Sequence, residues 1–166
     1  MTRRSVPRPR LVGLVALLAV LAAGCGDDDS APGGCGPVLR EALDPAYLVH
    51  VLDDDLDVEY SSDPPTSGPH KASPPDTGVV DRALSRPIQV GILERGDVLL
   101  QYDPALPDAD RERLEALVDD QVVVAPNPDL SVTVVATGWV YKQTCEAVDV
   151  PTLEDFVAER VGNGPE

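Results

Sequence analysis

Basic residues are scarce in this sequence. The chain has 13 Lys and Arg against 29 Asp and Glu, which gives a formal net charge of −16 at pH 7. A nucleic-acid-binding surface needs clustered Lys and Arg to neutralise phosphates, and a surface that binds anionic lipids needs a polybasic patch. The charge balance therefore argues against nucleic acid as a partner and against direct lipid binding by the folded part of the chain.

Aromatic residues make up only 4% of the 166 residues, although hydrophobic residues reach 43%, enough for one core. A chain of this length forms one ordinary domain with tails rather than two full domains. Its 17 prolines and 13 glycines predict a loop-rich domain and exclude a helical bundle. The sequence also lacks a phosphate-binding glycine loop, a haem attachment motif and a zinc motif, so none of these classes has a signature here.

The apolar stretch at residues 11–23 follows a start that carries four arginines. At about 1.5 Å per residue it covers about 20 Å, which is less than the ~30 Å of a membrane hydrocarbon core. A basic start, a short apolar stretch and small residues before a cysteine predict a signal peptide over residues 1–24. The pattern favours this signal peptide over a permanent transmembrane helix.

The residues LAAGC, ending at Cys25, resemble the bacterial lipobox, in which the cysteine is lipidated and becomes the mature N-terminus. We expect Cys25 to carry lipid (including palmitate) and to anchor the protein on the extracytoplasmic face of the cell membrane. The alternative is an ordinary secretory signal with an incidental cysteine. The polar stretch at 25–34 predicts a flexible acidic tether, and residues 35–166 predict a single globular domain.

Two further cysteines, Cys35 and Cys145, remain in the expected mature chain. In an exported protein two widely separated cysteines usually pair, so we expect a disulfide between them. The alternative, a redox or metal-binding pair, has no Cys-x-x-Cys spacing to support it.

The first half of the expected domain shows little of the hydrophobic periodicity that predicts helices or strands. A short helix is possible at 38–43, and the proline-rich stretch 63–76 predicts a long, semi-rigid loop because proline removes backbone donors and restricts its neighbours. Two short apolar runs then predict strands at 90–93 and 98–102, joined by a tight hairpin at 94–97.

The second half alternates helical and strand patterns. An amphipathic helix is expected at 107–120, a strand at 121–125, and a long strand at 131–141 with a bulge at Gly138. A capping box of Thr152 and Asp155 predicts the start of a last helix that ends at Gly162. This order predicts an α+β fold: a two-layer sandwich in which a mixed, mainly antiparallel sheet has helices packed on one face.

Several of these segments are familiar together. The string PPTSGPH at 64–70, the Leu-Glu and Gly at 93–96 and the segment ATGW at 136–139 resemble the bacterial envelope family called domain of unknown function 3105. The resemblance covers most of the chain from about His50 onward. Members of this family often have His-x-Leu-Glu-His-Gly where this chain has Gly91 and Arg95 at the two histidine positions. The resemblance implies an architecture more than an activity, since the family has no assigned function.

His50 and His70 are the only histidines, and neither has a partner at helical metal-ligand spacing. Together with Glu94 they are the candidate ligand-binding residues. The alternatives are that His70 is an ordinary hydrogen-bonded loop residue and that Glu94 pairs with Arg95 or with solvent.

The acidic run 53–59 superficially suggests calcium. An EF-hand loop needs Gly at its sixth position and Glu at its twelfth, and Val58 and Pro64 stand there instead. A solvated acidic turn is therefore the favoured interpretation of this run.

These observations lead to three hypotheses. The first is a non-enzymatic binding or interaction module of the cell envelope with a possible protein partner, for which no catalytic residue, metal or cofactor is assigned. The second is a copper-, zinc- or calcium-handling lipoprotein that uses His50, His70 and Glu94. The third is a hydrolase with Ser67 near His70, although the chain has no G-x-S-x-G elbow and no evident third residue.

Overall fold

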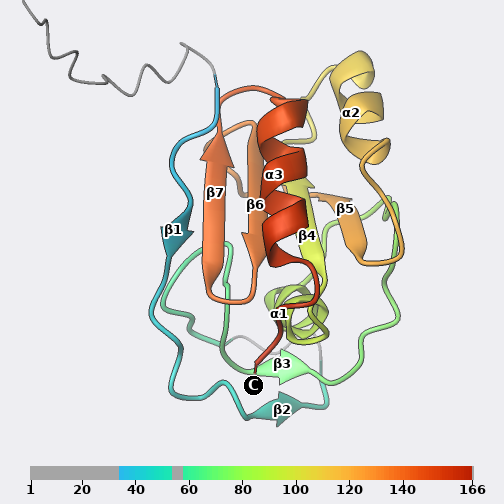
Figure 1. The fold of residues 1–166 in the computed structure, drawn as a ribbon. Helices are drawn as coiled ribbons and strands as arrows, with labels where there is room; N and C mark the ends of the chain where they lie inside the picture. Colours follow the sequence, from blue (N-terminus) through green and yellow to red (C-terminus); the bar gives the residue numbers. More distant parts are fainter. Residues whose placement is uncertain (1–33, 54–57, 166) are drawn as a thin grey trace, which may run out of the picture.

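The computed structural model describes residues 34–53 and 58–165. The predicted signal peptide, the lipidation site at Cys25 and nearly all of the tether lie outside these residues. A five-stranded sheet in the order β1-β7-β6-β4-β5 forms the centre of the fold (Figure 1). Its strands are β1 (Leu39–Arg40), β4 (Val98–Tyr102), β5 (Val122–Pro126), β6 (Val134–Gly138) and β7 (Tyr141–Cys145).

A second, two-stranded sheet pairs β2 (His50–Val51) in parallel with β3 (His70–Lys71). In the main sheet only β4 and β5 are parallel, and the other three neighbouring pairs are antiparallel. The described residues also form three helices, α1 (Arg86–Glu94), α2 (Asp108–Glu115) and α3 (Val150–Arg160). The predicted α+β class with a mixed, mainly antiparallel sheet is confirmed.

Both faces of the main sheet are covered. On one face Val98 and Leu100 of β4 share a core with Leu114 of α2 and with α3. On the opposite face Leu99 belongs to a second core that includes much of α1. Successive strand residues point to opposite faces, so an apolar strand such as β4 needs cover on both. Thus α2 and α3 lie on one face, whereas α1 packs against the other, so the predicted two-layer arrangement with helices on one face only is wrong (Figure 1).

The strand predicted at 90–93 is wrong, because these residues lie inside helix α1. Ser85 precedes the helix and Pro87 occupies its first turn, where a missing N–H costs nothing. Every residue from Pro87 to Leu93 is buried, and a short, fully buried helix cannot be distinguished from a buried strand by periodicity. The segment 94–97 therefore joins a helix to β4 rather than two strands, with Gly96 at a φ of 86°.

The single long strand predicted at 131–141 is also wrong. The chain turns back at Trp139 and Val140, so that β6 and β7 form an antiparallel pair. Val140 has a φ of 57°, an unusual conformation for a β-branched residue that no sequence pattern announces. Gly138 ends β6 and is paired with Tyr141 rather than forming a bulge.

The remaining boundaries differ in smaller ways. Helix α2 ends at Glu115, earlier than predicted, and the helix considered at 38–43 is instead the short strand β1. Helix α3 begins before Thr152: Asp149 is the N-cap, and its carboxylate accepts hydrogen bonds from the Thr152 backbone N–H and hydroxyl. The cap of this helix is thus an Asp–Thr pair rather than the predicted Thr–Asp box.

The predicted disulfide between Cys35 and Cys145 is present. It ties the segment before β1 to the last residue of β7, two positions separated by 110 in the sequence. Closing so long a loop lowers the conformational entropy of the unfolded chain. The chain-entropy model puts the resulting stabilisation of the fold at about 4–5 kcal/mol as an upper value. Within residues 34–53 and 58–165, none of the helices has the length and apolarity needed to cross a membrane.

Candidate metal centre

The part of the proline-rich loop that precedes His70 is fastened to the main sheet through one carboxylate. Glu41, just after β1, accepts hydrogen bonds from the hydroxyls of Ser62 and Thr66 and pairs with Lys142 of β7 at 2.9 Å. Burial, the largest single effect, raises the pKa of Glu41, but its hydrogen bonds and the charge of Lys142 together lower it below the ordinary value. A buried ion pair with these additional hydrogen bonds fixes the start of the loop.

The end of the same loop is held by Tyr60 and by Gly68. The Tyr60 hydroxyl donates to the carbonyl of Pro69 at 2.7 Å, and the ring lies so close that a Cβ on Gly68 would stand 2.9 Å from it. Gly68 also has a φ of 126°, which side-chain-bearing residues rarely adopt. Burial raises the pKa of Tyr60 to about 12, so the phenol remains a neutral donor over the physiological range. These contacts set the direction in which His70 leaves the loop.

The two histidines come together through strand pairing. His50 of β2 is the register partner of His70 of β3, and the His70 N–H donates to the carbonyl of Val49 at 3.0 Å. In a parallel pair, residues opposite each other present their side chains on the same face. The two imidazole rings are therefore neighbours, with centroids 4.7 Å apart and planes at 83°.

Helix α1 brings Glu94 to this face. The helix packs directly against β3, and at Gly91 the Lys71 carbonyl is so close that a Cβ would stand 2.2 Å from it. Only glycine permits this approach. Arg95 donates to the backbone carbonyls of Pro74 and Asp76 and pairs with Asp97, which anchors the segment after β3 to the end of α1.

In the resulting cluster one carboxylate lies between two imidazoles. Glu94 Oε1 is 3.5 Å from His50 Nε2, and Glu94 Oε2 is 3.0 Å from His70 Nε2. The candidate ligand atoms of the three residues all lie within 4.8 Å of one another. The His70 side chain is 1% exposed, Glu94 is 29% exposed and His50 is 54% exposed, so the cluster opens to solvent on the His50 side.

The hydrogen bond made by Nδ1 of His70 determines whether Nε2 of the neutral ring carries a proton or a lone pair. Nδ1 lies 2.9 Å from the Gly68 carbonyl, which can only accept, so Nδ1 carries a proton. Nε2 is buried and has no hydrogen-bond partner among the described residues, because the nearby Glu94 oxygen lies outside hydrogen-bond geometry. In the neutral ring this nitrogen presents a lone pair to the cluster.

The two His–Glu94 separations, one to each carboxylate oxygen, are compatible with a metal ion shared by the cluster. Two ligands that each lie about 2.0–2.1 Å from one ion, at angles between octahedral and tetrahedral, are about 2.9–3.4 Å apart. The His70–Glu94 separation of 3.0 Å falls in this range, and the His50–Glu94 separation of 3.5 Å lies just beyond it. Two ligand atoms of one ion point at the ion rather than at each other. This matches His70 Nε2 and Glu94 Oε2, which lie 3.0 Å apart without forming a hydrogen bond.

The geometry answers one of the alternatives for these residues, the pairing of Glu94 with Arg95. Glu94 faces the histidines, while Arg95 pairs with Asp97. Among the described residues Ser67 makes no hydrogen bond to His70: its hydroxyl accepts from the Asp44 N–H at 2.9 Å, and His70 Nδ1 faces the Gly68 carbonyl. Asp55 and Asp57 of the acidic run lie outside the described residues.

Sequence reasoning missed Glu41, Lys142 and Tyr60, which hold the loop but touch no candidate ligand. Glu41 and Lys142 belong to no motif and lie far from His70 in the sequence, whereas Tyr60 stands only ten residues before His70. The proline-rich, polar loop is the sequence feature that indicates such partners, since the hydroxyl groups of an ordered loop need hydrogen-bond partners when they are buried.

The described residues thus define an α+β domain with two histidines and one carboxylate converging at the end of a buried helix. The chain belongs to the DUF3105 family, proteins of unknown function, whose sequence profile matches residues 31–166. No curated protein matches the chain. Likewise, no solved structure matches it.

Proposed function

We propose that this chain binds a divalent transition-metal ion through His50, His70 and Glu94, and that it handles this metal in the cell envelope. The observation that carries the proposal is the environment of His70 Nε2. This nitrogen is buried, has no hydrogen-bond partner within residues 34–53 and 58–165, and stands 3.0 Å from a carboxylate oxygen. A neutral imidazole would direct its lone pair at a negative group here, which is unfavourable unless a cation lies between them.

A simple ion pair is the competing explanation for the His70–Glu94 contact. An imidazolium at His70 would donate from Nε2, and the carboxylate does not lie in position to accept. An ion pair also gives no reason for His50 to approach the same carboxylate from the other strand. A metal ion accounts for all three side chains at once.

The donor set indicates which ion fits. Imidazole nitrogens favour Zn²⁺, Cu²⁺ and Ni²⁺, whereas Ca²⁺ takes oxygen ligands almost exclusively. Both cysteines of the described part are in the disulfide, so thiolates do not contribute. The ligand set therefore favours Zn²⁺ or Cu²⁺ and does not suit Ca²⁺.

Three protein ligands leave at least one position of a tetrahedral ion open. Structural zinc sites are closed by four protein ligands, and an open position is typical of sites that bind a further ligand or release the metal. The partly exposed His50 forms the accessible side of the cluster. These features support reversible binding and transfer of metal rather than a purely structural role.

The proposed location follows from the sequence. We propose that Cys25 is lipidated after removal of residues 1–24, which would anchor the domain to the outer face of the cell membrane. The disulfide supports this, because stable disulfides belong to compartments outside the reducing cytosol.

The proposal is tested by titrating the metal-free full chain, purified without a histidine tag, with Zn²⁺ and Cu²⁺ in separate calorimetric experiments. We expect one equivalent to bind, and His50→Ala and Glu94→Gln each to weaken binding by at least about tenfold. Glu146→Gln is the matched control, because it removes the same charge from an exposed carboxylate outside the cluster. Unchanged affinity in both cluster variants would refute the proposal.

A further inference from the structure

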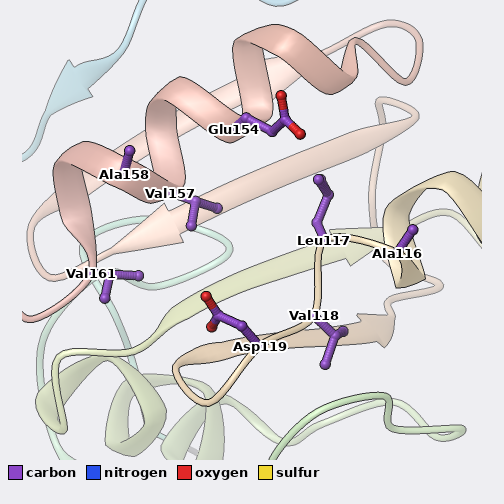
Figure 2. Close-up of a pocket in the computed structure, with 8 residues that line it drawn as sticks. All are labelled: Ala116, Leu117, Val118, Asp119, Glu154, Val157, Ala158 and Val161. Carbon is purple, nitrogen blue, oxygen red and sulfur yellow. The ribbon is translucent and has the colours of Figure 1, made fainter.

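A groove lies between the segment that follows α2 and one flank of α3 (Figure 2). Its volume is about 510 Å³. Apart from two alanines, the apolar lining consists of side chains that also pack against the main core: Leu117, Val118, Val157 and Val161. The floor of the groove is therefore apolar and continuous with the core.

Two carboxylates flank this apolar floor. Figure 2 shows Glu154 of α3 and Asp119, beyond α2, on opposite sides of the apolar side chains. Asp119 accepts a hydrogen bond from the Gln121 N–H, but within the described ranges neither carboxylate forms an ion pair with Lys or Arg. The groove thus presents an apolar floor between two negative edges without internal counter-charges.

We propose that this groove is a docking site for a polypeptide segment of a partner protein, one that carries aliphatic side chains flanked by Lys or Arg. Aliphatic groups would cover the floor, and a cation at each side would meet Asp119 and Glu154. The separation of the carboxylates on opposite edges favours a chain with charges at two positions over a small molecule with one. The net charge of −16 attracts a basic partner over longer distances.

This site is independent of the proposed metal centre. The groove is formed by α3 and the segment after α2, whereas the metal ligands belong to β2, β3 and α1. No residue is common to the two sets, so either proposal can fail without affecting the other.

The test is selection of phage-displayed random short peptides on the immobilised full chain, followed by affinity measurement of the enriched peptides. We expect the enriched sequences to combine aliphatic residues with Lys or Arg. Their affinity should fall about tenfold or more in Glu154→Lys and stay unchanged in Asp155→Lys, a neighbouring exposed position outside the groove.

Thermal unfolding of both variants establishes that they are equally folded. Peptides that bind Glu154→Lys as tightly as the native chain would overturn the proposal. Enrichment of acidic sequences, or no enrichment at all, would overturn it equally.

Discussion

His50 and His70 stand opposite each other in the parallel pair of β2 and β3, with their imidazole rings almost perpendicular and 4.7 Å apart between centroids. The register of this short pair sets the distance between the two nitrogens that face Glu94. A shift by one residue would turn one ring to the other face, since side chains alternate along a strand. The proposed metal centre therefore depends on the contacts that hold β3 in place relative to β2 and α1.

The close approach of α1 and β3 gives the first prediction. Gly91→Ala would place a Cβ 2.2 Å from the Lys71 carbonyl, so the helix and the strand must move apart. We expect a loss of about 1–3 kcal/mol in the free energy of unfolding, measured by urea denaturation. Because β3 carries His70, zinc affinity should fall as well.

Gly36→Ala is the control for this variant, since a Cβ there meets its nearest atom at 3.6 Å. Equal stability and equal zinc affinity in the Gly91 and Gly36 variants would show that α1 does not constrain β3.

The second prediction concerns the carboxylate that fastens the loop. Glu41→Gln leaves the largely buried Lys142 without its counter-charge, and we expect a loss of about 1–3 kcal/mol at neutral pH, less than for a fully buried pair because Glu41 is partly exposed. The measurement is urea denaturation of both proteins at neutral pH.

The pH dependence of this effect has a definite sign. The folded-state pKa of Glu41 lies below its ordinary value of 4.5, so its ionised form stabilises the fold above that value. This stabilisation is lost as the pH falls through the folded-state pKa, and the stability curves of native protein and Glu41→Gln should converge in acid. A stability difference that stays constant down to strongly acidic pH would contradict this assignment.

The third prediction uses the buried phenol. Tyr60→Phe removes the hydrogen bond to the Pro69 carbonyl and should cost about 0.5–1.5 kcal/mol at neutral pH. In the unfolded chain Tyr60 ionises near its ordinary value of 10.0, but in the folded chain only near 12. The neutral phenol therefore stabilises the fold below pH 10, and this contribution is lost as the pH rises through the folded-state value.

The measurement is alkaline unfolding of the native protein and of Tyr60→Phe, monitored by circular dichroism. The native protein should lose more stability between pH 10 and 12 than Tyr60→Phe does. Parallel stability curves for the two proteins over this interval would contradict it.

The fourth prediction concerns the disulfide. Replacement of both Cys35 and Cys145 by Ser should lower the free energy of unfolding by several kcal/mol, with about 4–5 kcal/mol as the upper value for a loop of this length. Thermal unfolding of the double variant, compared with native protein under non-reducing conditions, measures the loss. A change below about 1 kcal/mol would mean that the bridge adds little to the fold.

Much of the scaffold was predictable from the sequence because its strands are apolar and β-branched. The strand at 98–102, the disulfide and the α+β class all followed from local patterns and from cysteine arithmetic. Helix α1 was missed because all its residues from Pro87 to Leu93 are buried, which erases the helical period that separates a helix from a strand.

The arrangement of the candidate site could not be predicted in the same way. The sequence identifies His50, His70 and Glu94 as unusual residues, but their convergence depends on two-residue strands that have no recognisable pattern. It also depends on the helical conformation of α1, whose last residue is Glu94. Long-range contacts such as Glu41 with Lys142 complete the arrangement, and these have no local signature.

The central claim is that both histidines and Glu94 ligate one metal ion. The most direct measurement is X-ray absorption spectroscopy at the zinc edge on the full chain loaded with one equivalent of Zn²⁺. We predict two imidazole nitrogens and at least one carboxylate oxygen at about 2.0–2.2 Å. A shell of oxygen ligands alone, without imidazole scattering, would contradict the proposed centre.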